Sequence, residues 1–172
     1  MPKIIKNGIV VDDSWQRLNL AEGETPASVT LPAGPLLVPL EVWLTRREEL
    51  LGRTEPLGVW LAGADDPELI AGDLAAFSLI AIEFLKFADG RGYSTASLLR
   101  RRYGYKGELR AIGEVLRDQL FYMQRVGFDA YALRADKNIE DALASLKDFS
   151  LVYQGSVNPP LGRRAAAVVE GA

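Results

Sequence analysis

The second half of the chain repeats a strand-then-helix pattern, and this repetition restricts the folds open to the chain more than any other feature. Apolar runs typical of strands alternate with segments whose apolar residues recur at i, i+4 and i+7, as do Leu116, Leu120 and Met123. The predicted helices begin near residues 67, 94, 115 and 138, so their starts are 27, 21 and 23 residues apart. Such βα units need parallel strands with right-handed crossovers, so we expect an α/β fold.

Glycine, proline and capping residues set the bounds of the predicted elements. The strands expected in the repeat cover residues 58–62, 79–84, 108–113, 129–133 and 151–153. The helices expected there cover residues 67–76, 94–103, 115–126 and 138–148. Ahead of the repeat, Asn7-Gly8 predicts a type I′ hairpin, residues 28–31 a short strand, and residues 40–51 a helix that ends at Gly52.

Proline usage divides the chain, because six of its nine prolines fall between residues 2 and 56. We expect a β-rich N-terminal segment with one helix at 1–56, a βα-repeat core at 57–157 and a C-terminal tail at 158–172. A chain of 172 residues is about the length of one domain, so these parts are expected to share one core.

Residues 79–84 indicate how the sheet is shaped, since alternate residues of a strand share a face. One face carries the bulky residues Ile80, Ile82 and Phe84. The other carries Leu79, Ala81 and Glu83. This asymmetry favours a partial (β/α) barrel-like repeat of about four to five parallel strands, with bulky residues under the outer helices. The alternative is an open doubly wound parallel sheet, which needs bulky residues on both faces. The N-terminal strands or a second copy of the chain would then cover the open side.

The chain contains no histidine and no cysteine, which removes several chemistries. Zinc, haem or iron–sulfur ligation by His or Cys, a Ser-His-Asp triad and a thiolate nucleophile are all excluded. A net charge of −3 argues against general binding to nucleic acid. No apolar run is long enough to span a membrane and no signal peptide is recognisable, so we expect a cytoplasmic protein.

Polar residues concentrate after the predicted strands, where parallel sheets place their ligands. Glu83 at the end of one strand and Lys86 and Asp89 after it are the candidate catalytic residues, with an ion pair at a strand end as the alternative. Glu114 and Asp118 follow the next strand and are candidate rim residues.

The densest polar segment is a glycine turn that is a candidate anion site. Its residues are Gly90, Arg91, Gly92, Tyr93 and Ser94, and Arg134 is expected to join them from the last strand. Two glycines permit backbone angles at which N–H groups converge, and a serine at a helix start favours an anion. The alternative is a helix-capping turn.

Other patterns in the chain are weaker. The Gly90-x-Gly92 pair leaves a borrowed flavin or nicotinamide open as a cofactor, although Thr95 stands in place of the third glycine of a dinucleotide fingerprint. No recognised spacing supports a metal site. The basic run Arg100, Arg101 and Arg102 is expected to point outward, either as a solvated surface or as a docking site for an acidic partner.

Several runs together resemble a bacterial family, domain-of-unknown-function family 934. They are IEFLKFADGRGYS at 82–94, GELRAIG at 107–113, VPLEVW at 38–43 and GFDA at 127–130. Leu85 and Ala88 differ from the usual proline and threonine of the first run, and neither difference removes a charge.

The resemblance implies a setting in sulfur assimilation, because the genes of this family tend to lie beside the haemoprotein subunit of sulfite reductase. The family is sometimes labelled an oxidoreductase without an established reaction. We therefore expect an accessory protein of assimilatory sulfate or sulfite reduction, with that haemoprotein as partner and a small anion as ligand. The alternative is a small barrel-like enzyme or oxidoreductase that acts on an anionic small molecule. Whether the chain catalyses any reaction, and whether it forms a homo-oligomer, both stay open.

Overall fold

The computed structural model of the protein describes residues 1–86 and 89–147, and within these residues eight strands form one sheet. The sheet has the order β2-β1-β8-β7-β6-β5-β4-β3. The strands are β1 (Lys3–Lys6), β2 (Ile9–Asp12), β3 (Gln16–Arg17), β4 (Leu36–Pro39), β5 (Leu57–Leu61), β6 (Leu79–Phe84), β7 (Glu108–Gly113) and β8 (Ala130–Tyr131). Neighbours from β3 to β8 are parallel, whereas β1 is antiparallel to both β8 and β2. The prediction of a mainly parallel α/β sheet is therefore confirmed.

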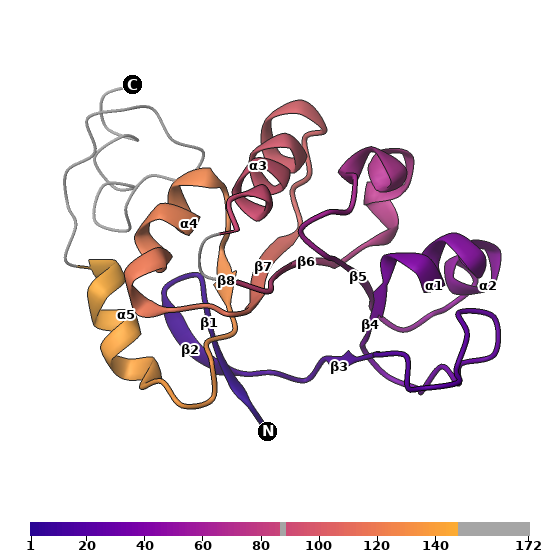
Figure 1. Cartoon of the computed structure of the whole chain (residues 1–172), viewed down its shortest axis with the longest axis horizontal. Helices are drawn as coiled ribbons and strands as arrows, with labels where there is room; N and C mark the ends of the chain where they lie inside the picture. The colour runs from indigo at the N-terminus through magenta and orange to yellow at the C-terminus, as the bar shows by residue number, and fades with distance from the viewer. Residues whose placement is uncertain (87–88, 148–172) are drawn as a thin grey trace.

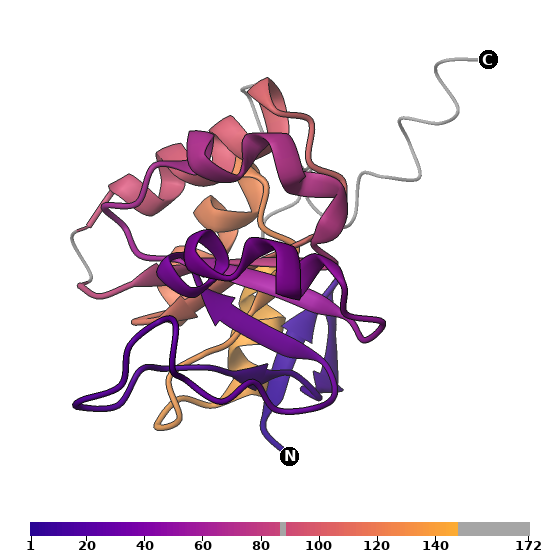
Figure 2. The ribbon, with the colours of Figure 1, turned by 90° about the vertical axis from the view of Figure 1, so that its right-hand side faces the viewer.

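Helices connect the parallel strands from β4 to β8, and a last helix follows β8. They are α1 (Leu40–Thr45), α2 (Arg47–Leu51), the 3₁₀ helix η1 (Pro67–Ala76), α3 (Arg91–Ser97), the π-helical turn η2 (Leu98–Arg102), the 3₁₀ turn η3 (Arg117–Gln119), α4 (Leu120–Val126) and α5 (Ile139–Lys147). Figure 1 shows the sheet curled into a half-barrel arch, with α1, η1, α3 and α4 outside it. Figure 2 shows the same helices from the side, and none of the described helices is long and apolar enough to cross a membrane.

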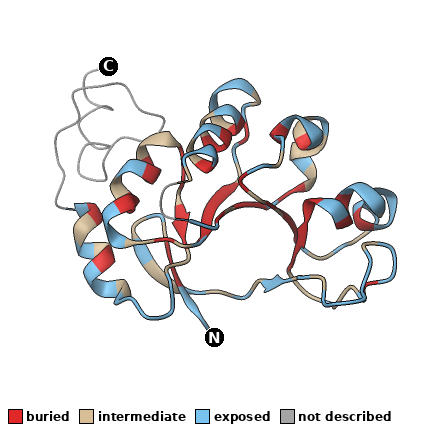
Figure 3. Cartoon of the chain, in the orientation of Figure 1, coloured by how far each residue is buried: buried red, intermediate tan, exposed pale blue. Residues whose placement is uncertain are grey.

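The two faces of the sheet differ as residues 79–84 predict. Ile80, Ile82 and Phe84 lie in the main core beneath the outer helices. Leu79 and Ala81 belong instead to a small apolar cluster on the concave face, with Leu37, Ile112 and Trp15. Figure 3 shows that the buried residues line the arch, while the outer surfaces of the helices are exposed.

A strap of chain, residues 13–18, crosses the concave face from β2 to β3 (Figure 1). The Asp13 carboxylate bonds the buried Arg110 of β7 at 3.0 Å, and Trp15 packs on the concave cluster. The Leu18 carbonyl accepts a hydrogen bond from Trp60 Nε1 at 3.1 Å. The N-terminal part of the chain therefore lies across the open side of the arch and also extends its edge, because β1 pairs with β8.

Several predicted bounds were wrong in the N-terminal part. Residues 28–31 form no strand, and the strand lies at Leu36–Pro39, where four successive buried residues suit a parallel strand between two others. The predicted helix at 40–51 is two short helices that meet at Arg46. The hairpin prediction is confirmed, since Asn7 and Gly8 both have positive φ, 51° and 80°.

In the repeat, the helix predicted at 94–103 begins earlier, at Arg91, and the strand predicted at 129–133 shortens to Ala130–Tyr131. The cap predicted at Asn138 is confirmed, because its side chain accepts the backbone N–H groups of Glu140 and Asp141. The predicted strand at 151–153 and the tail at 158–172 lie outside the described residues.

Candidate functional site

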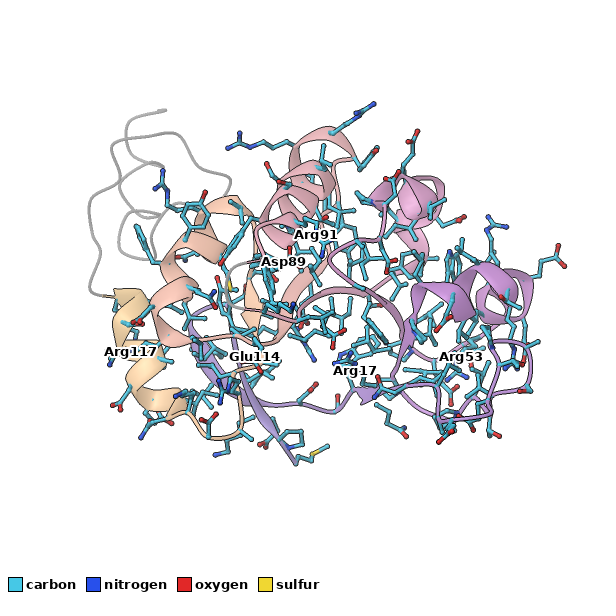
Figure 4. All side chains as sticks on the ribbon, viewed as in Figure 1. Arg17, Arg53, Asp89, Arg91, Glu114 and Arg117 are labelled. Carbon is cyan, nitrogen blue, oxygen red and sulfur yellow. The ribbon has the colours of Figure 1, made fainter. Side chains whose placement is uncertain are left out.

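Three ion pairs stand at the carboxyl ends of β5 to β8, and we call their six residues the rim. The rim comprises Arg17, Glu83, Asp89, Arg91, Glu114 and Arg134. Because β6, β7 and β8 are parallel neighbours, Glu83, Glu114 and Arg134 leave the sheet at one edge. In Figure 4, Asp89 and Arg91 lie beside α3, whereas Arg17 and Glu114 lie between the arch and the strap.

Glu83 is the last residue but one of β6, faces the concave side and is mostly buried. Its Oε1 accepts a hydrogen bond from Arg17 Nη2 at 2.6 Å. The Arg17 guanidinium also lies over the Trp60 ring, 4.3 Å from the ring centroid. The candidate catalytic carboxylate is thus held in an ion pair by a residue of the strap.

Asp89 of the rim is held as a carboxylate by Arg91. Its carboxylate accepts hydrogen bonds from Arg91 Nε, Nη2 and backbone N–H, between 2.9 and 3.1 Å. The hydrogen bonds from Arg91 lower the pKa of Asp89 from 3.8 to about 2. One carboxylate oxygen also lies against Gly63, where a Cβ would approach it to 2.8 Å. Asp89 is therefore ionised at any physiological pH and positions the start of α3.

The backbone reason for the predicted anion turn is wrong for both glycines. Gly90 has φ −81°, an angle that every residue adopts, and Gly92 lies inside α3. Gly92 instead allows close packing, since a Cβ there would lie 2.6 Å from the Phe84 ring. The predicted alternative, a helix-capping turn, describes this segment better because Asp89 bonds the first N–H group of α3.

The remaining residues of this segment differ in exposure. Lys86 and Ser94 are exposed, and Ser94 lies one turn inside α3 rather than at its start. Tyr93 packs against Phe84 and Tyr122, with ring centroids 5.2 and 5.0 Å apart. Burial raises the pKa of Tyr93. Tyr93 is therefore a packing residue in this structure.

The structure pairs Glu114, a predicted rim residue, with Arg134, which was expected to join the glycine turn instead. Arg134 Nη1 donates to Glu114 Oε2 at 3.1 Å, and the same guanidinium bonds Asp136 through Nε and Nη2. Asp118 lies apart from this pair, in η3, where its carboxylate is exposed near Arg117.

Arg100 contradicts the prediction of an outward basic run. Its side chain is 11% exposed and bonds the carbonyls of Tyr105, Gly107 and Gly127 and the Asp129 carboxylate. The π-helical turn η2 widens the helix, which a period of 3.6 residues does not anticipate. Arg101 and Arg102 do point to solvent.

Sequence reasoning missed Arg17 and Trp60, although both belong to the rim environment. Arg17 lies 66 residues before Glu83, in a two-residue strand with no pattern of its own. The one available signal was Trp60, an aromatic residue on the polar face of a predicted parallel strand. Within the described residues, no group of three or more acidic side chains is arranged to hold a metal ion.

Fold and rim together define a half-barrel α/β protein with an arginine-rich ionic edge at the carboxyl ends of its parallel strands. Residues 58–162, more than half of the chain, match the model of a bacterial protein family of unknown function, DUF934. The chain belongs to this family. No curated protein and no solved structure is detectably similar to it.

Proposed function

We propose that the protein is an accessory protein of assimilatory sulfate or sulfite reduction that binds a small oxyanion at the rim. The metabolic setting comes from the resemblance of the runs at 82–94 and 107–113 to family 934. The anion site is supported by the rim itself, which places three arginines at the edge where parallel sheets bind ligands.

Arg17 is the observation that carries the anion site. In the described part of the chain it bonds a carboxylate through Nη2 alone, whereas Arg91 and Arg134 each engage theirs through two or more nitrogens. Nε and Nη1 of Arg17 thus keep N–H groups for another acceptor. Stacking on Trp60 holds the guanidinium plane in place, so an oxyanion meets a preorganised donor.

The alternative is an enzyme or oxidoreductase that acts on an anionic small molecule. Its support is the position of Glu83 and Lys86 at the carboxyl end of β6. Against it, the pKa of Asp89 is about 2, far from the value a general acid or base needs near neutral pH. Of the three candidate catalytic residues, Asp89 is therefore unsuited to proton transfer near neutral pH.

We also propose that the arch is a partial (β/α) barrel rather than a piece of a doubly wound sheet. The main core lies beneath the outer helices, while the concave face carries only a small apolar cluster beside the charged residues Glu108 and Arg110. In a doubly wound sheet, helices would cover both faces.

Anion binding is tested by measuring the melting temperature of the protein at increasing concentrations of sulfite, sulfate or chloride. We expect sulfite and sulfate to raise the melting temperature at millimolar concentration, with chloride at matched ionic strength as the control. Arg17→Gln should abolish the shift, and Arg101→Gln, an exposed arginine outside the rim, should keep it. Equal shifts with all three salts would contradict the site.

The accessory role is tested separately, by mixing the purified protein with sulfite reductase haemoprotein and by growing a deletion strain on sulfate. We expect a complex in analytical ultracentrifugation and a growth defect that sulfide relieves. Absence of both results would remove this role. Flavins and nicotinamide nucleotides belong in the same thermal assay, because a shift with either would favour the oxidoreductase.

A further inference from the structure

An apolar hollow lies beside the carboxyl ends of β4 and β5, and none of the rim residues lines it. The hollow has a volume of about 430 Å³ and lies between Leu44 of α1, Leu69 of η1 and Trp60 of β5. We call it the leucine hollow. Parallel α/β sheets bind partners and ligands at this end, so its position agrees with a binding role.

Two large leucines at the hollow are exposed to an unusual degree. Leu44 is 47% exposed and Leu69 is 53% exposed. Single exposed leucines are ordinary on a protein surface. Two leucines that flank one apolar hollow form a contiguous apolar patch, whose exposure to water is unfavourable. A partner that covers both leucines gains the hydrophobic contribution of their burial.

Acidic groups surround the hollow, and among the described residues they form no ion pairs. Glu41 and Asp65 line it, Glu68 adjoins Leu69, and no lysine or arginine is among its lining residues. In the described part of the chain none of these three carboxylates is in an ion pair, and Asp65 bonds only the Ala62 backbone N–H. The surface therefore complements a partner that combines apolar and basic side chains.

We propose that the leucine hollow is the docking surface for a basic amphipathic helix of a partner protein. The walls are themselves helical, α1 and η1, so a third helix can lay an apolar ridge of residues spaced i, i+4 and i+7 between Leu44 and Leu69. Lysine or arginine on either side of that ridge then faces Glu41, Asp65 and Glu68. This surface does not depend on anion binding at the rim.

Trp60 connects the hollow to the rim. Its ring lines the hollow and also carries the Arg17 guanidinium at 4.3 Å. Helix docking therefore changes the environment of Trp60, and the indole emission reports it. Trp43 is fully buried and serves as an internal reference, while Trp60→Phe assigns the signal.

The probe is a synthetic 18-residue helix of leucine and lysine with leucines at i, i+4 and i+7, added to the full-length protein. We expect micromolar binding by tryptophan emission and calorimetry, weakened by salt because the charge contacts are exposed. A peptide of the same composition in scrambled order, and one with glutamate in place of lysine, should bind at least about tenfold more weakly.

The variants localise the binding. The double variant Leu44→Lys/Leu69→Lys should weaken peptide binding at least about tenfold, because its lysines repel the positively charged peptide. Leu51→Lys is the matched control, since Leu51 is 45% exposed but lies outside the hollow, and it should change affinity less than about twofold. Circular dichroism confirms that each variant is folded.

Three outcomes would overturn the proposal. The amphipathic peptide binds no better than its scrambled form, Leu51→Lys weakens binding as much as the double variant, or the hollow is occupied by a second copy. The last outcome would appear as concentration-dependent association in ultracentrifugation that Leu44→Lys abolishes. Sulfite titration of the Leu44→Lys/Leu69→Lys variant separates this test from the rim, whose response should be unchanged.

Discussion

Asp89 shows how one ion pair makes the protein sensitive to pH. Arg91 lowers the pKa of Asp89 from 3.8 to about 2 by hydrogen bonding to its ionised form. An acid whose pKa is lower in the folded state stabilises the fold above its ordinary pKa, and this stabilisation is lost as pH falls through the folded value.

We therefore expect Asp89→Asn to reduce the free energy of unfolding by a constant amount above about pH 5, and by progressively less between pH 4 and 2. Urea unfolding of both proteins at a series of pH values measures this difference. Arg91→Gln removes the other side chain of this ion pair, so its loss of stability should show the same pH dependence. A difference that is flat down to pH 2 would mean that the ion pair does not form in solution.

Arg100 and Arg101 are neighbours in sequence with opposite surroundings. Arg100 bonds three carbonyls and the Asp129 carboxylate, whereas Arg101 faces solvent. Burial raises the pKa of Asp129, and the Arg100 charge opposes that change. Arg100 thus joins the starting ends of β7 and β8, a structural role that the charge run in the sequence conceals.

Replacing Arg100 by leucine removes this donor from the three carbonyls and leaves Asp129 with the Leu109 N–H group but no cation, so we expect a loss of about 3 kcal/mol in stability. Arg101→Leu should cost less than about 0.5 kcal/mol. Equilibrium urea denaturation of the two variants gives both numbers. Similar losses for both would place Arg100 on the surface after all.

The contact between α3 and β6 requires a glycine at position 92 but not at position 90. Gly92 brings the first turn of α3 against Phe84, at a distance that leaves no room for a Cβ. Gly90, two residues earlier, has open space around its Cα. The two glycines look equivalent in sequence, and only the packing of the elements distinguishes them.

Gly92→Ala should therefore destabilise the protein by about 1–3 kcal/mol through overpacking against Phe84. Gly90→Ala should be neutral or stabilise it by up to about 1 kcal/mol, because φ −81° suits alanine and the unfolded chain loses freedom. Thermal unfolding of the pair tests the assignment. The reverse ranking would restore the backbone role predicted for Gly90.

Elements with local patterns were predictable, and those set by distant contacts were not. Apolar periodicity and caps predicted β5 to β7 and the helix after Asn138, since these signals lie within each segment. The strand at Leu36–Pro39 escaped because it has no alternation and ends in proline. In the rim, strand order placed Glu114 and Arg134 at the same end of the sheet without predicting their ion pair. Arg17 was missed altogether, since its partner Glu83 is remote in sequence.

Across the whole molecule, one buried charge network attaches the N-terminal part to the sheet. Arg110, only 3% exposed, bonds Glu108 within β7 and Asp13 of the strap, and Glu108 also pairs with Lys6 of β1. These ion pairs connect the strap and the N-terminal hairpin to the central strand β7.

Arg110→Met would leave Glu108 and Asp13 facing each other without their shared cation, and we expect a loss of about 3–5 kcal/mol. Lys6→Met should cost no more than about 1 kcal/mol, because Lys6 is 42% exposed and Arg110 still neutralises Glu108. Urea denaturation measures both, and hydrogen exchange at residues 13–18 shows whether the strap opens. Unchanged protection there in Arg110→Met would separate the strap from the network.

The pairing of Ile5 with Tyr131 has a consequence for how the protein is made. During synthesis the first hairpin leaves the ribosome long before the strand that it must join. Its apolar side chains stay without their final neighbours until β8 (Ala130–Tyr131) has emerged, because contacts between distant residues form late. We therefore expect the protein to refold slowly. A circular permutant that brings β1 next to β8 along the chain should refold faster.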